Sequence, residues 1–567
     1  MSRPFTPYPF TLVRHPARLP SLTGNRDAGH HSVVIVGAGP VGYTVALGLA
    51  AHGVRSVLIE ADDGVCVGSR AICISRRSLQ IFERLGVLEG FLKIGLPWTG
   101  GRSFYRGEQV LHFTMPHDEN QKLPPMVNLA QYHIEQILLD RAEALADLID
   151  IRWQTRVTGV HTREDGTALS VETPLGAYTL DADWVVAADG GRSFVRESLG
   201  LALNGTTYEG RYVIVDILLE SKRPTERLAY FDPPCNPGST VLVHKQPDNV
   251  WRVDYQLKDG EDPDEAIKPE NVIPRVTSLL EMMGERGGWS PIWIAMYRAH
   301  ALTLDRYRHG RVLFAGDAAH LLPIFGVRGA NSGIDDADNL AWKLALVVQG
   351  IAGDRLLDSY SDERVAAARE NLAQGAKSTE FMAPPSFAFS LMREAVLGLA
   401  THHAGVRSLI NPRQTSAIAY SSSPLNVADD TGAFRAGPAP GAVLPECPIT
   451  ILENGQSRLG HVTDLLGARF ALLTFSEDGA VSSTAIEALA RLSAAAVPIA
   501  LCPISQRSAT GARERLSVDH TGRLFAMFDA HPGTVYLLRP DGHVLGRWHS
   551  PDAAAIVDAV LHALDQS

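Results

Sequence analysis

The sequence predicts a chain of mixed α/β and α+β class. An apolar run at His31–Val36 ends in the glycine-rich segment GAGPVG and precedes an alanine- and leucine-rich helical run. Short alternating, β-forming runs separated by turn residues follow between residues 212 and 257. A segment rich in Ser, Pro and Gly at 421–441 then separates a smaller α/β pattern. These observations predict a Rossmann-like dinucleotide-binding domain interleaved with an antiparallel sheet, and a C-terminal α/β domain.

Composition and length limit the class of protein. The 567 residues allow three or four domains, and a hydrophobic fraction of 45% with 20% charged residues is typical of globular chains. The net charge of −11 argues against a nucleic-acid partner, which needs a basic surface. No apolar run is long enough to cross a membrane, and residues 1–30 lack a secretory apolar core. We therefore expect an irregular N-terminal arm, a cytoplasmic location and no membrane or nucleic-acid partner.

The five cysteines are scattered along the chain and never form a CxxC pair. This pattern predicts neither a disulfide framework nor a metal site.

The glycine-rich turn carries the first functional signal. Gly37, Gly39 and Gly42 permit a tight turn, close approach of a pyrophosphate and close packing of helix on strand. The next strand, Val54–Glu60, ends in an acid placed to bind adenosine ribose hydroxyls. The turn alone does not distinguish FAD from NAD.

Two later motifs make that distinction. Asp189-Gly190 follows the predicted buried strand Asp183–Ala188, and Gly316-Asp317 follows the strand Arg311–Phe314. Either pair alone is compatible with a structural turn. In this order after GxGxxG, the two pairs indicate a flavoprotein.

At these residues the chain resembles the flavoprotein aromatic hydroxylases, the single-component FAD monooxygenases of the p-hydroxybenzoate hydroxylase and phenol hydroxylase type. The resemblance spans about His31 to Ile410. It rests on GAGPVG, Ser69-Arg70-Ala71, Gln131, ADGGRS, and GDAAHLLP followed by DADNLAWKLA.

The resemblance implies FAD-binding roles. Asp189 would lie near the FAD and nicotinamide pyrophosphates, Asp317 would bind the ribityl chain, and Arg70 would lie by the FAD phosphates. The expected FAD-binding residues are Gly37, Gly39, Pro40, Val41, Gly42, Glu60, Ala61, Arg70, Gln131, Asp189, Gly190, Gly316, Asp317, Pro323, Gly329, Ala330 and Asn331.

A helix is predicted over Asn331–Val348, after Gly326 and Gly329. Its N-terminus would point at the flavin pyrimidine edge, where its free N–H groups and dipole stabilise the anionic reduced flavin. The chain departs from the family pattern here, because Ile324 follows Pro323 and Val327-Arg328 replaces a Gly-Gln pair. Arg328 could support an anionic substrate or the reduced flavin, or make a phosphate or structural contact.

The resemblance also implies the reaction. NAD(P)H reduces FAD, O2 adds at flavin C4a, and the resulting hydroperoxide transfers one oxygen to a phenolic or related ring. No second GxGxxG unit is present, which fits a family in which the reductant docks transiently. The alternatives are another FAD enzyme on this fold, such as a halogenase or an epoxidase, and a non-catalytic flavin-binding regulatory protein.

The substrate sheet is expected at about 97–127 and 204–300. Side chains of its strand 250–257 alternate between two faces, so Tyr255 and Val253 face away from Asp254 and Arg252. We expect Tyr255 and Val253 to face the pocket and predict Tyr255, Pro323 and Arg328 as catalytic. The other candidates to bind the ring hydroxyl are His244, Asp254, Tyr297, His300 and His320, of which His320 is expected to be structural.

Residues 442–567 resemble the thioredoxin-like domain appended in phenol hydroxylase relatives. Because this domain lacks CxxC, we expect a packing role or a homodimer contact rather than disulfide exchange.

Overall fold

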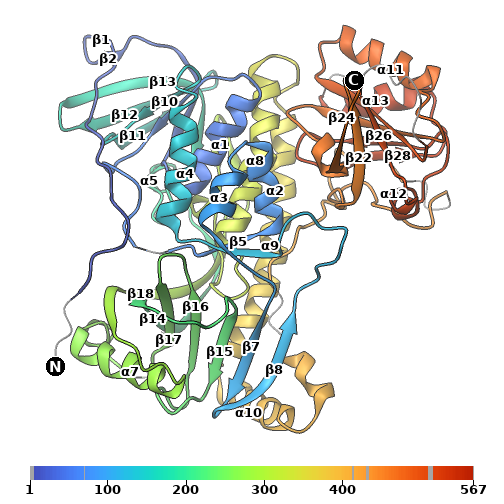
Figure 1. Ribbon diagram of the computed structural model, residues 1–567. Helices are drawn as coiled ribbons and strands as arrows, with labels where there is room; N and C mark the ends of the chain where they lie inside the picture. Colours follow the sequence, from blue (N-terminus) through green and yellow to red (C-terminus); the bar gives the residue numbers. More distant parts are fainter. Residues whose placement is uncertain are drawn as a thin grey trace.

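The computed structural model describes residues 5–68, 70–258, 260–410, 414–429, 433–507 and 515–565, without the Glu209 side chain. Three large sheets define three units that lie next to one another, as Figure 1 shows. Among these described residues, no helix combines the length and apolarity needed to cross a membrane.

The first unit is built on parallel strands. Neighbouring strands run in the order β10, β4, β3, β13, β20, and all of these pairings are parallel. Their bounds are β3 His31–Val36, β4 Ser56–Ile59, β10 Ile149–Arg152, β13 Gly176–Ala187 and β20 Val312–Phe314. The shorter strands of this sheet are β1 Leu22–Thr23, β2 Arg26–Asp27, β11 Arg156–Thr162, β12 Thr167–Thr173 and β19 Arg308–His309.

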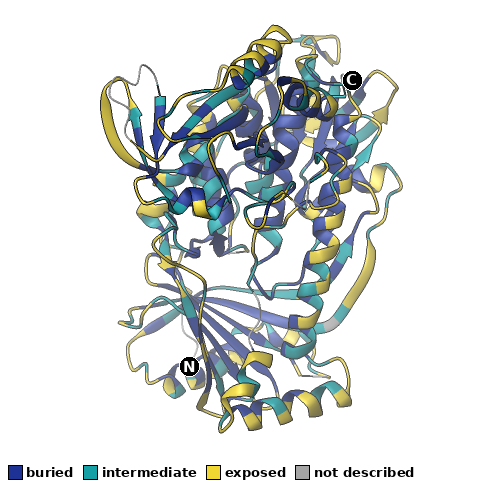
Figure 2. Ribbon diagram, turned by 90° about the vertical axis from the view of Figure 1, so that its right-hand side faces the viewer, coloured by how far each residue is buried: buried dark blue, intermediate teal, exposed yellow. Residues whose placement is uncertain are grey.

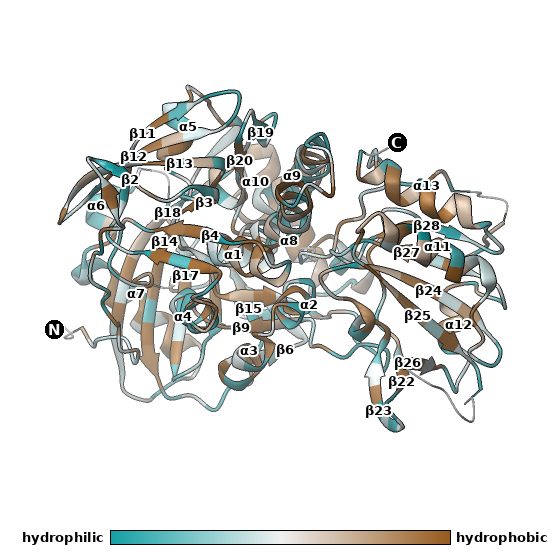
Figure 3. Cartoon of the chain, turned by 90° about the horizontal axis from the view of Figure 1, so that it is seen from above, coloured by the Kyte–Doolittle hydropathy of each residue, from teal (hydrophilic) through white to brown (hydrophobic). Residues whose placement is uncertain are grey.

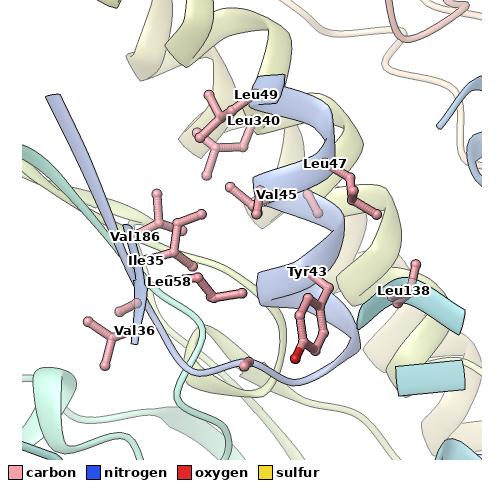
Figure 4. Packing of buried hydrophobic residues seen from close by; sticks show 14 of the residues in the cluster. Ile35, Val36, Tyr43, Val45, Leu47, Leu49, Leu58, Leu138, Val186 and Leu340 are labelled. Atoms are coloured by element: carbon pink, nitrogen blue, oxygen red, sulfur yellow. The ribbon is translucent and has the colours of Figure 1, made fainter. Parts of the chain in front are cut away.

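Helix α1 (Pro40–Ala51) packs on this sheet and against α8 (Gly329–Val348). Figure 4 shows Val45 and Leu49 of α1 above Ile35, Leu58 and Val186 of three adjacent strands. Residues 42–50 of α1 are buried on every side, as expected for a helix that is apolar all round. The other helices of this unit are α2 Arg76–Arg84, α3 Leu88–Ile94, α4 Gln131–Glu143 and α5 Phe194–Ser198.

The second unit is an eight-stranded sheet in the order β21-β18-β14-β17-β16-β15-β7-β8. Helix α7 (Pro269–Met282) covers one face with an apolar core, and the other face lies against the first unit. The strands of this sheet are largely buried, as Figure 2 shows. Their bounds are β7 Gly100–Tyr105, β8 Glu108–Thr114, β14 Asn204–Leu219, β15 Arg227–Phe231, β16 Thr240–Lys245, β17 Val250–Gln256, β18 Trp289–Thr303 and β21 His320–Leu321.

Smaller elements connect these units. A three-stranded sheet of β5 (Cys73–Ser75), β9 (Met126–Asn128) and β6 (Leu96–Trp98) lies between them. The remaining elements are α6 Pro263–Ala266, α9 Leu356–Met382 and α10 Phe387–Ala400, with 3-10 turns at Gly316–Ala318, Ala404–Leu409 and Val462–Leu465.

The C-terminal unit lies to one side of the first, as Figure 3 shows. Trp342 and Leu346 of α8 belong to the same apolar core as Leu472 and Ile556, so the unit packs directly on the helix that begins at Gly329. Its strands are β22 Pro448–Glu453, β23 Gln456–His461, β24 Phe470–Ser476, β25 Ile499–Ser505, β26 Arg515–Val518, β27 Val535–Leu538 and β28 Val544–Trp548, and its helices are α11 Ser483–Ala494, α12 Arg523–Met527 and α13 Ala553–Ala563.

The structure departs from the predicted elements in two places. The sequence pattern of residues 128–146, after a Pro-Pro turn, predicts one helix, but the helix begins only at Gln131, because residues 126–128 pair as β9 with two neighbouring strands. The buried strand predicted at Asp183–Ala188 is the second half of the longer strand β13, which pairs with β12 along its first half and with β3 along its second.

Candidate active site

Three loops meet where β3, β13 and β20 end. These strands are parallel neighbours, so the turns at Gly37, Asp189 and Gly316 lie at one edge of the sheet. Gly37 has a φ of +102°, and a Cβ there would lie 2.5 Å from the Ala188 carbonyl oxygen. Only glycine fits this position.

Arg196 joins two of these loops. Its Nη2 donates to the Gly191 carbonyl at 2.8 Å and its Nη1 to the Ala318 carbonyl at 3.0 Å. The side chain is buried, so these two contacts fix the Asp189 and Asp317 loops relative to each other.

Two helix N-termini adjoin the same loops. A Cβ on Gly39, before α1, or on Gly329, at the start of α8, would have no atom within 4 Å. By contrast, a Cβ on Gly316 or Gly333 would lie 2.8 or 2.7 Å from Val41 Cγ2. The loops therefore pack tightly around Val41 but leave open space at both helix ends, where free N–H groups favour an anion. This space suits FAD, because a pyrophosphate and an electron-rich ring can each take one helix end.

Glu60 is fixed at the end of β4. Its Oε2 accepts from the Ala38 N–H at 2.7 Å and its Oε1 from the Asp62 N–H at 2.9 Å. Both oxygens keep a second lone pair for a ribose hydroxyl.

The carboxyl groups of Asp317 and Asp189, in two of these loops, have raised pKa values. The Asp317 side chain is reached by solvent, yet the surrounding protein raises its pKa, partly offset by His320 and Arg70. Burial likewise raises the pKa of Asp189, whose Oδ2 accepts from the Val195 N–H at 3.1 Å. In the described part of the chain, Oδ1 of Asp189 has no partner.

Asp336 of α8 holds the Asp317 loop in place. Asp336 Oδ2 accepts from the Gly316 N–H at 2.9 Å and lies 2.7 Å from His320 Nε2, while Oδ1 accepts from Arg364 Nε at 2.6 Å. Burial raises the pKa of Asp336, but Arg364 and His320 outweigh it and lower the pKa to about 2. His320 is fully buried in this network, in agreement with a structural role.

The loop that carries Arg70 is held by Gln131. Gln131 Oε1 accepts from the Ala71 N–H at 3.0 Å, and its Nε2 donates to Glu135 Oε1 at 2.8 Å. Gln131 therefore positions this loop through its side chain. Ala61 follows Glu60 directly, and Ser69 of the quoted motif lies outside the described residues.

The expectation that Tyr255 and Val253 face the pocket is wrong. Both belong to the apolar core under α7, and Arg275 of α7 lies over the Tyr255 ring. The opposite pair faces the first unit, since Arg252 Nη1 donates to the Arg70 carbonyl at 2.9 Å and Nε donates to Asp254 Oδ1 at 2.9 Å. Helix α7 needs an apolar sheet face, and the odd-numbered residues of β17 supply it.

Sequence reasoning placed Arg252 on the wrong face and did not consider Arg227. Both guanidinium groups are buried on the sheet face turned to the first unit, near His244. Burial and these two arginines lower the pKa of His244 to about 3, so its imidazole is neutral at pH 7. Strand alternation could have located Arg252, because it is a polar position between the apolar residues Trp251 and Val253.

Strand β18 forms the wall nearest the Asp317 loop. Trp293, Ala295 and Tyr297 alternate along it and are partly exposed. Tyr297 Oη lies 3.4 Å from the Leu322 carbonyl, and a Cβ on Gly68 would lie 2.8 Å from the Trp293 ring. Trp251 and Trp289 belong to the α7 core instead. His300 lies further along β18, with Nδ1 3.1 Å from Thr207 Oγ1.

The residues before α8 are mostly packed. Pro323 is buried, and a Cβ on Gly375 of α9 would lie 3.2 Å from it. Arg328 is buried and donates to Asn371 Oδ1 at 2.9 Å, in the wall of a cavity of about 760 Å³ shared with α2, α9 and residues 443–446. Asn331 Oδ1 accepts from the Ser75 N–H, and its Nδ2 donates to the Cys73 carbonyl. Its side chain is therefore occupied, and the backbone N–H groups of Gly329, Ala330 and Asn331 remain for a ligand.

Among the described residues, no cluster of His, Cys, Asp or Glu suits a metal ion.

Comparison with known proteins identifies the family. A model of the FAD binding domain family matches residues 30–375, more than half of the chain. The chain belongs to this family. A model described as the HcaD C-terminal domain matches residues 449–563, and the thioredoxin-like assignment of that region stays a prediction.

Several relatives that match nearly the whole chain are named hydroxylases. The 3-(3-hydroxy-phenyl)propionate/3-hydroxycinnamic acid hydroxylase of Mycobacterium avium is 30% identical over 95% of this chain and 93% of its own. The protein of the same name from Mycolicibacterium smegmatis is 28% identical over 94% of both chains. Among solved structures, aklavinone-11 hydroxylase with FAD and aklavinone matches with a TM-score of 0.72 at 25% identity, over 94% of this chain and 99% of that one. The flavin-dependent monooxygenase PieE, at 22% identity, shares the fold with a TM-score of 0.76 over 95% of this chain and 100% of that one.

These findings confirm the predicted fold class, FAD as cofactor and an FAD-dependent aromatic hydroxylase as the class of enzyme.

Proposed function

We propose that the enzyme uses NAD(P)H and O2 to hydroxylate a single-ring phenol that carries a short side chain. The observation that carries the proposal is the contact between substrate sheet and flavin loop, where Tyr297 Oη lies 3.4 Å from the Leu322 carbonyl. A ring bound on the β18 face would lie beside the Asp317 loop. Similarity over 94–95% of the chain to hydroxylases named for 3-hydroxyphenyl acids supports a substrate of this size.

The residues that would hold FAD follow from the geometry. The N–H groups at Gly39 and the start of α1 would bind the pyrophosphate, Glu60 would bind the ribose hydroxyls and Asp317 would bind the ribityl chain. The N–H groups of Gly329 and Ala330 would stabilise negative charge on the flavin ring. Bound FAD supplies two-electron redox chemistry between NAD(P)H and O2.

Side chains of β18 would also orient the substrate ring and bind its hydroxyl group. A phenolate is more reactive than a phenol toward an electrophilic oxygen, so a hydrogen-bond partner at the ring hydroxyl assists. Tyr297 is the group we assign to this contact, because it is partly exposed on the cleft wall. Trp293, two residues before it on the same face, supplies a flat apolar surface for the ring.

Product analysis tests the proposal. The purified holoenzyme is incubated with NADH or NADPH and 3-(3-hydroxyphenyl)propionate, with aklavinone as a polycyclic comparison. We expect a product one oxygen heavier than the phenol, formed in proportion to NAD(P)H consumed. NAD(P)H oxidation that yields only peroxide with every phenol, or oxygenation of aklavinone alone, would contradict the proposal. Homodimerisation and a cytoplasmic location stay predictions from the sequence.

A further inference from the structure

We propose that residues 5–15 of the N-terminal arm, the arm segment, hold the first unit against the substrate sheet and thereby slow the release of FAD. The family model matches residues 30–375, so it does not include this segment. The proposal depends on FAD as the cofactor and not on the identity of the aromatic substrate.

The sequence of the arm segment is typical of an extended chain with one face on the protein. Even-numbered residues from 6 to 12 are partly buried, and odd-numbered residues from 5 to 13 are exposed. The inward side chains are those of Thr6, Tyr8, Phe10 and Leu12. Pro7 and Pro9 occupy outward positions, where the ring fixes φ and no N–H group needs a partner. The prolines therefore reduce the conformational entropy that the arm segment loses when it docks.

The beginning of the arm segment contacts the substrate sheet next to Trp293. The Thr6 N–H donates to the Pro291 carbonyl of β18 at 2.9 Å. Tyr8 Oη donates to Asp216 Oδ2 of β14 at 2.6 Å. Asp216 is the register partner of Trp293, which lies two residues after Pro291. The arm segment is therefore attached to both strands close to the position of Trp293.

The end of the arm segment contacts the loop that follows Glu60. The His15 N–H donates to the Asp63 carbonyl at 2.7 Å. A Cβ on Gly64 would lie 2.6 Å from the Val13 carbonyl oxygen, so the two backbones are in direct contact. Glu60 is the residue that would bind the ribose hydroxyls of FAD. The arm segment therefore lies on a loop that adjoins the proposed ribose site.

Aromatic packing attaches the arm segment to two further elements of the first unit. The ring centroids of Phe10 and of Tyr132 in α4 lie 4.8 Å apart, and the His15 ring stacks on Trp153 at 4.6 Å. Gln154 Nε2 donates to the His15 carbonyl at 2.8 Å. Trp153 and Gln154 directly follow β10, so the arm segment is fixed to α4 and to the end of β10 as well as to the loop.

The two ends of the arm segment are attached to the two sides of one joint. The loop after Glu60 continues to Gly68, where an added Cβ would lie 2.8 Å from the Trp293 ring. The first unit and the substrate sheet thus touch at Gly68 and Trp293. Figure 1 shows the chain running from the substrate sheet along the first unit to β1 and β2. The arm segment must detach at one end before this joint opens, so a cofactor bound beside the loop leaves more slowly.

A double-mutant cycle tests the proposal in the FAD-loaded enzyme. Gly64→Ala adds a methyl group whose three nearest atoms all belong to Val13 and Leu12 of the arm segment. Release of FAD is followed by the rise in flavin fluorescence after dilution, in the wild type, in G64A, in a variant lacking residues 2–15 and in the combination of both changes. We expect the deletion to speed release about tenfold, and G64A to speed it about threefold in the full chain but less than about 1.5-fold in the deleted chain.

Leu492→Ala separates this role from an effect on general stability. Leu492 is fully buried in α11 of the C-terminal unit, so its truncation should lower stability while the rate of FAD release stays within about twofold of the wild type. Equal acceleration by G64A in both chains, a deleted chain that releases FAD at the wild-type rate, or acceleration in L492A that matches the deletion would overturn the proposal. If the deleted chain does not fold, full-length G64A and L492A still decide. Faster release in G64A alone supports the proposal, and wild-type release in G64A overturns it.

Discussion

Arg539 of the C-terminal unit and Glu363 of helix α9 form an ion pair at 2.6 Å in which both side chains are fully buried. Lys343 of α8 donates to the same carboxylate at 2.8 Å, and Asp541 pairs with Arg539. Arg77 of α2 donates to the Asp541 carbonyl at 2.9 Å. The C-terminal unit is thus joined through buried charges to α8, whose first turn adjoins the flavin cleft.

Breaking this network should destabilise the whole protein. We expect Arg539→Met to lower the free energy of unfolding by about 3–5 kcal/mol, because Glu363 and Asp541 are left as buried charges without their main partner. Urea denaturation measures the loss. Arg491→Met, at an exposed pair with Glu487, serves as control and should change stability by less than about 0.5 kcal/mol. A loss below about 1 kcal/mol in R539M would show that the network is dispensable.

The glycine turn should be intolerant of a single methyl group. A Cβ on Gly42 would lie 1.9 Å from the Gly37 carbonyl oxygen, so Gly42→Ala must displace the turn that faces the pyrophosphate. We expect FAD affinity to fall by about tenfold or more, measured by flavin release on dilution. Gly398→Ala, in α10 with no atom within 4 Å of the added Cβ, should retain FAD fully. Unchanged FAD retention in G42A would refute the assigned pyrophosphate site.

His244 predicts a pH dependence of stability. Its pKa is about 3 in the folded protein, against an ordinary value near 6.5, so below pH 6.5 the unfolded chain binds a proton that the folded chain does not. The stabilisation is complete above pH 6.5 and is lost as pH falls toward 3, by about 2 kcal/mol between pH 6.5 and 5. In His244→Gln this part of the loss should be absent. The exposed His112→Gln variant serves as the control in urea melts at both pH values. A pH profile of H244Q that matches the wild type would disprove the assignment.

The N-terminal arm should stabilise the substrate sheet. Tyr8 Oη donates to buried Asp216 Oδ2 at 2.6 Å, and Phe10 packs on Tyr132 of α4. We expect Tyr8→Phe to lower the free energy of unfolding by about 1–3 kcal/mol, since a buried carboxylate loses a donor. Phe5→Tyr, on the same arm but exposed, is the matched control. Equal stability of Y8F and the wild type would show that the arm contact contributes nothing.

Local signals in the sequence predict most residues of the proposed cofactor site. Buried strands directly precede the glycine turn, Glu60, Asp189 and Gly316-Asp317. Because these strands are parallel, the loops that follow them lie at one edge of the sheet. The substrate face could not be settled in this way. Alternation shows that Tyr255 and Asp254 point apart, but helix α7, later in the chain, decides which of them is buried against a helix. Likewise, nothing near Glu363 in the sequence indicates Arg539 as its partner.

Anaerobic stopped-flow reduction tests most directly whether the cleft belongs to a substrate-responsive aromatic hydroxylase. The holoenzyme is mixed with NADH or NADPH, with and without 3-(3-hydroxyphenyl)propionate or its neutral alcohol, and flavin absorbance is followed. We expect the phenol to accelerate flavin bleaching at least about tenfold, a difference of about 1.4 kcal/mol in the barrier. Bleaching at the same rate with and without every phenol, or no bleaching with either nucleotide, would contradict the assignment.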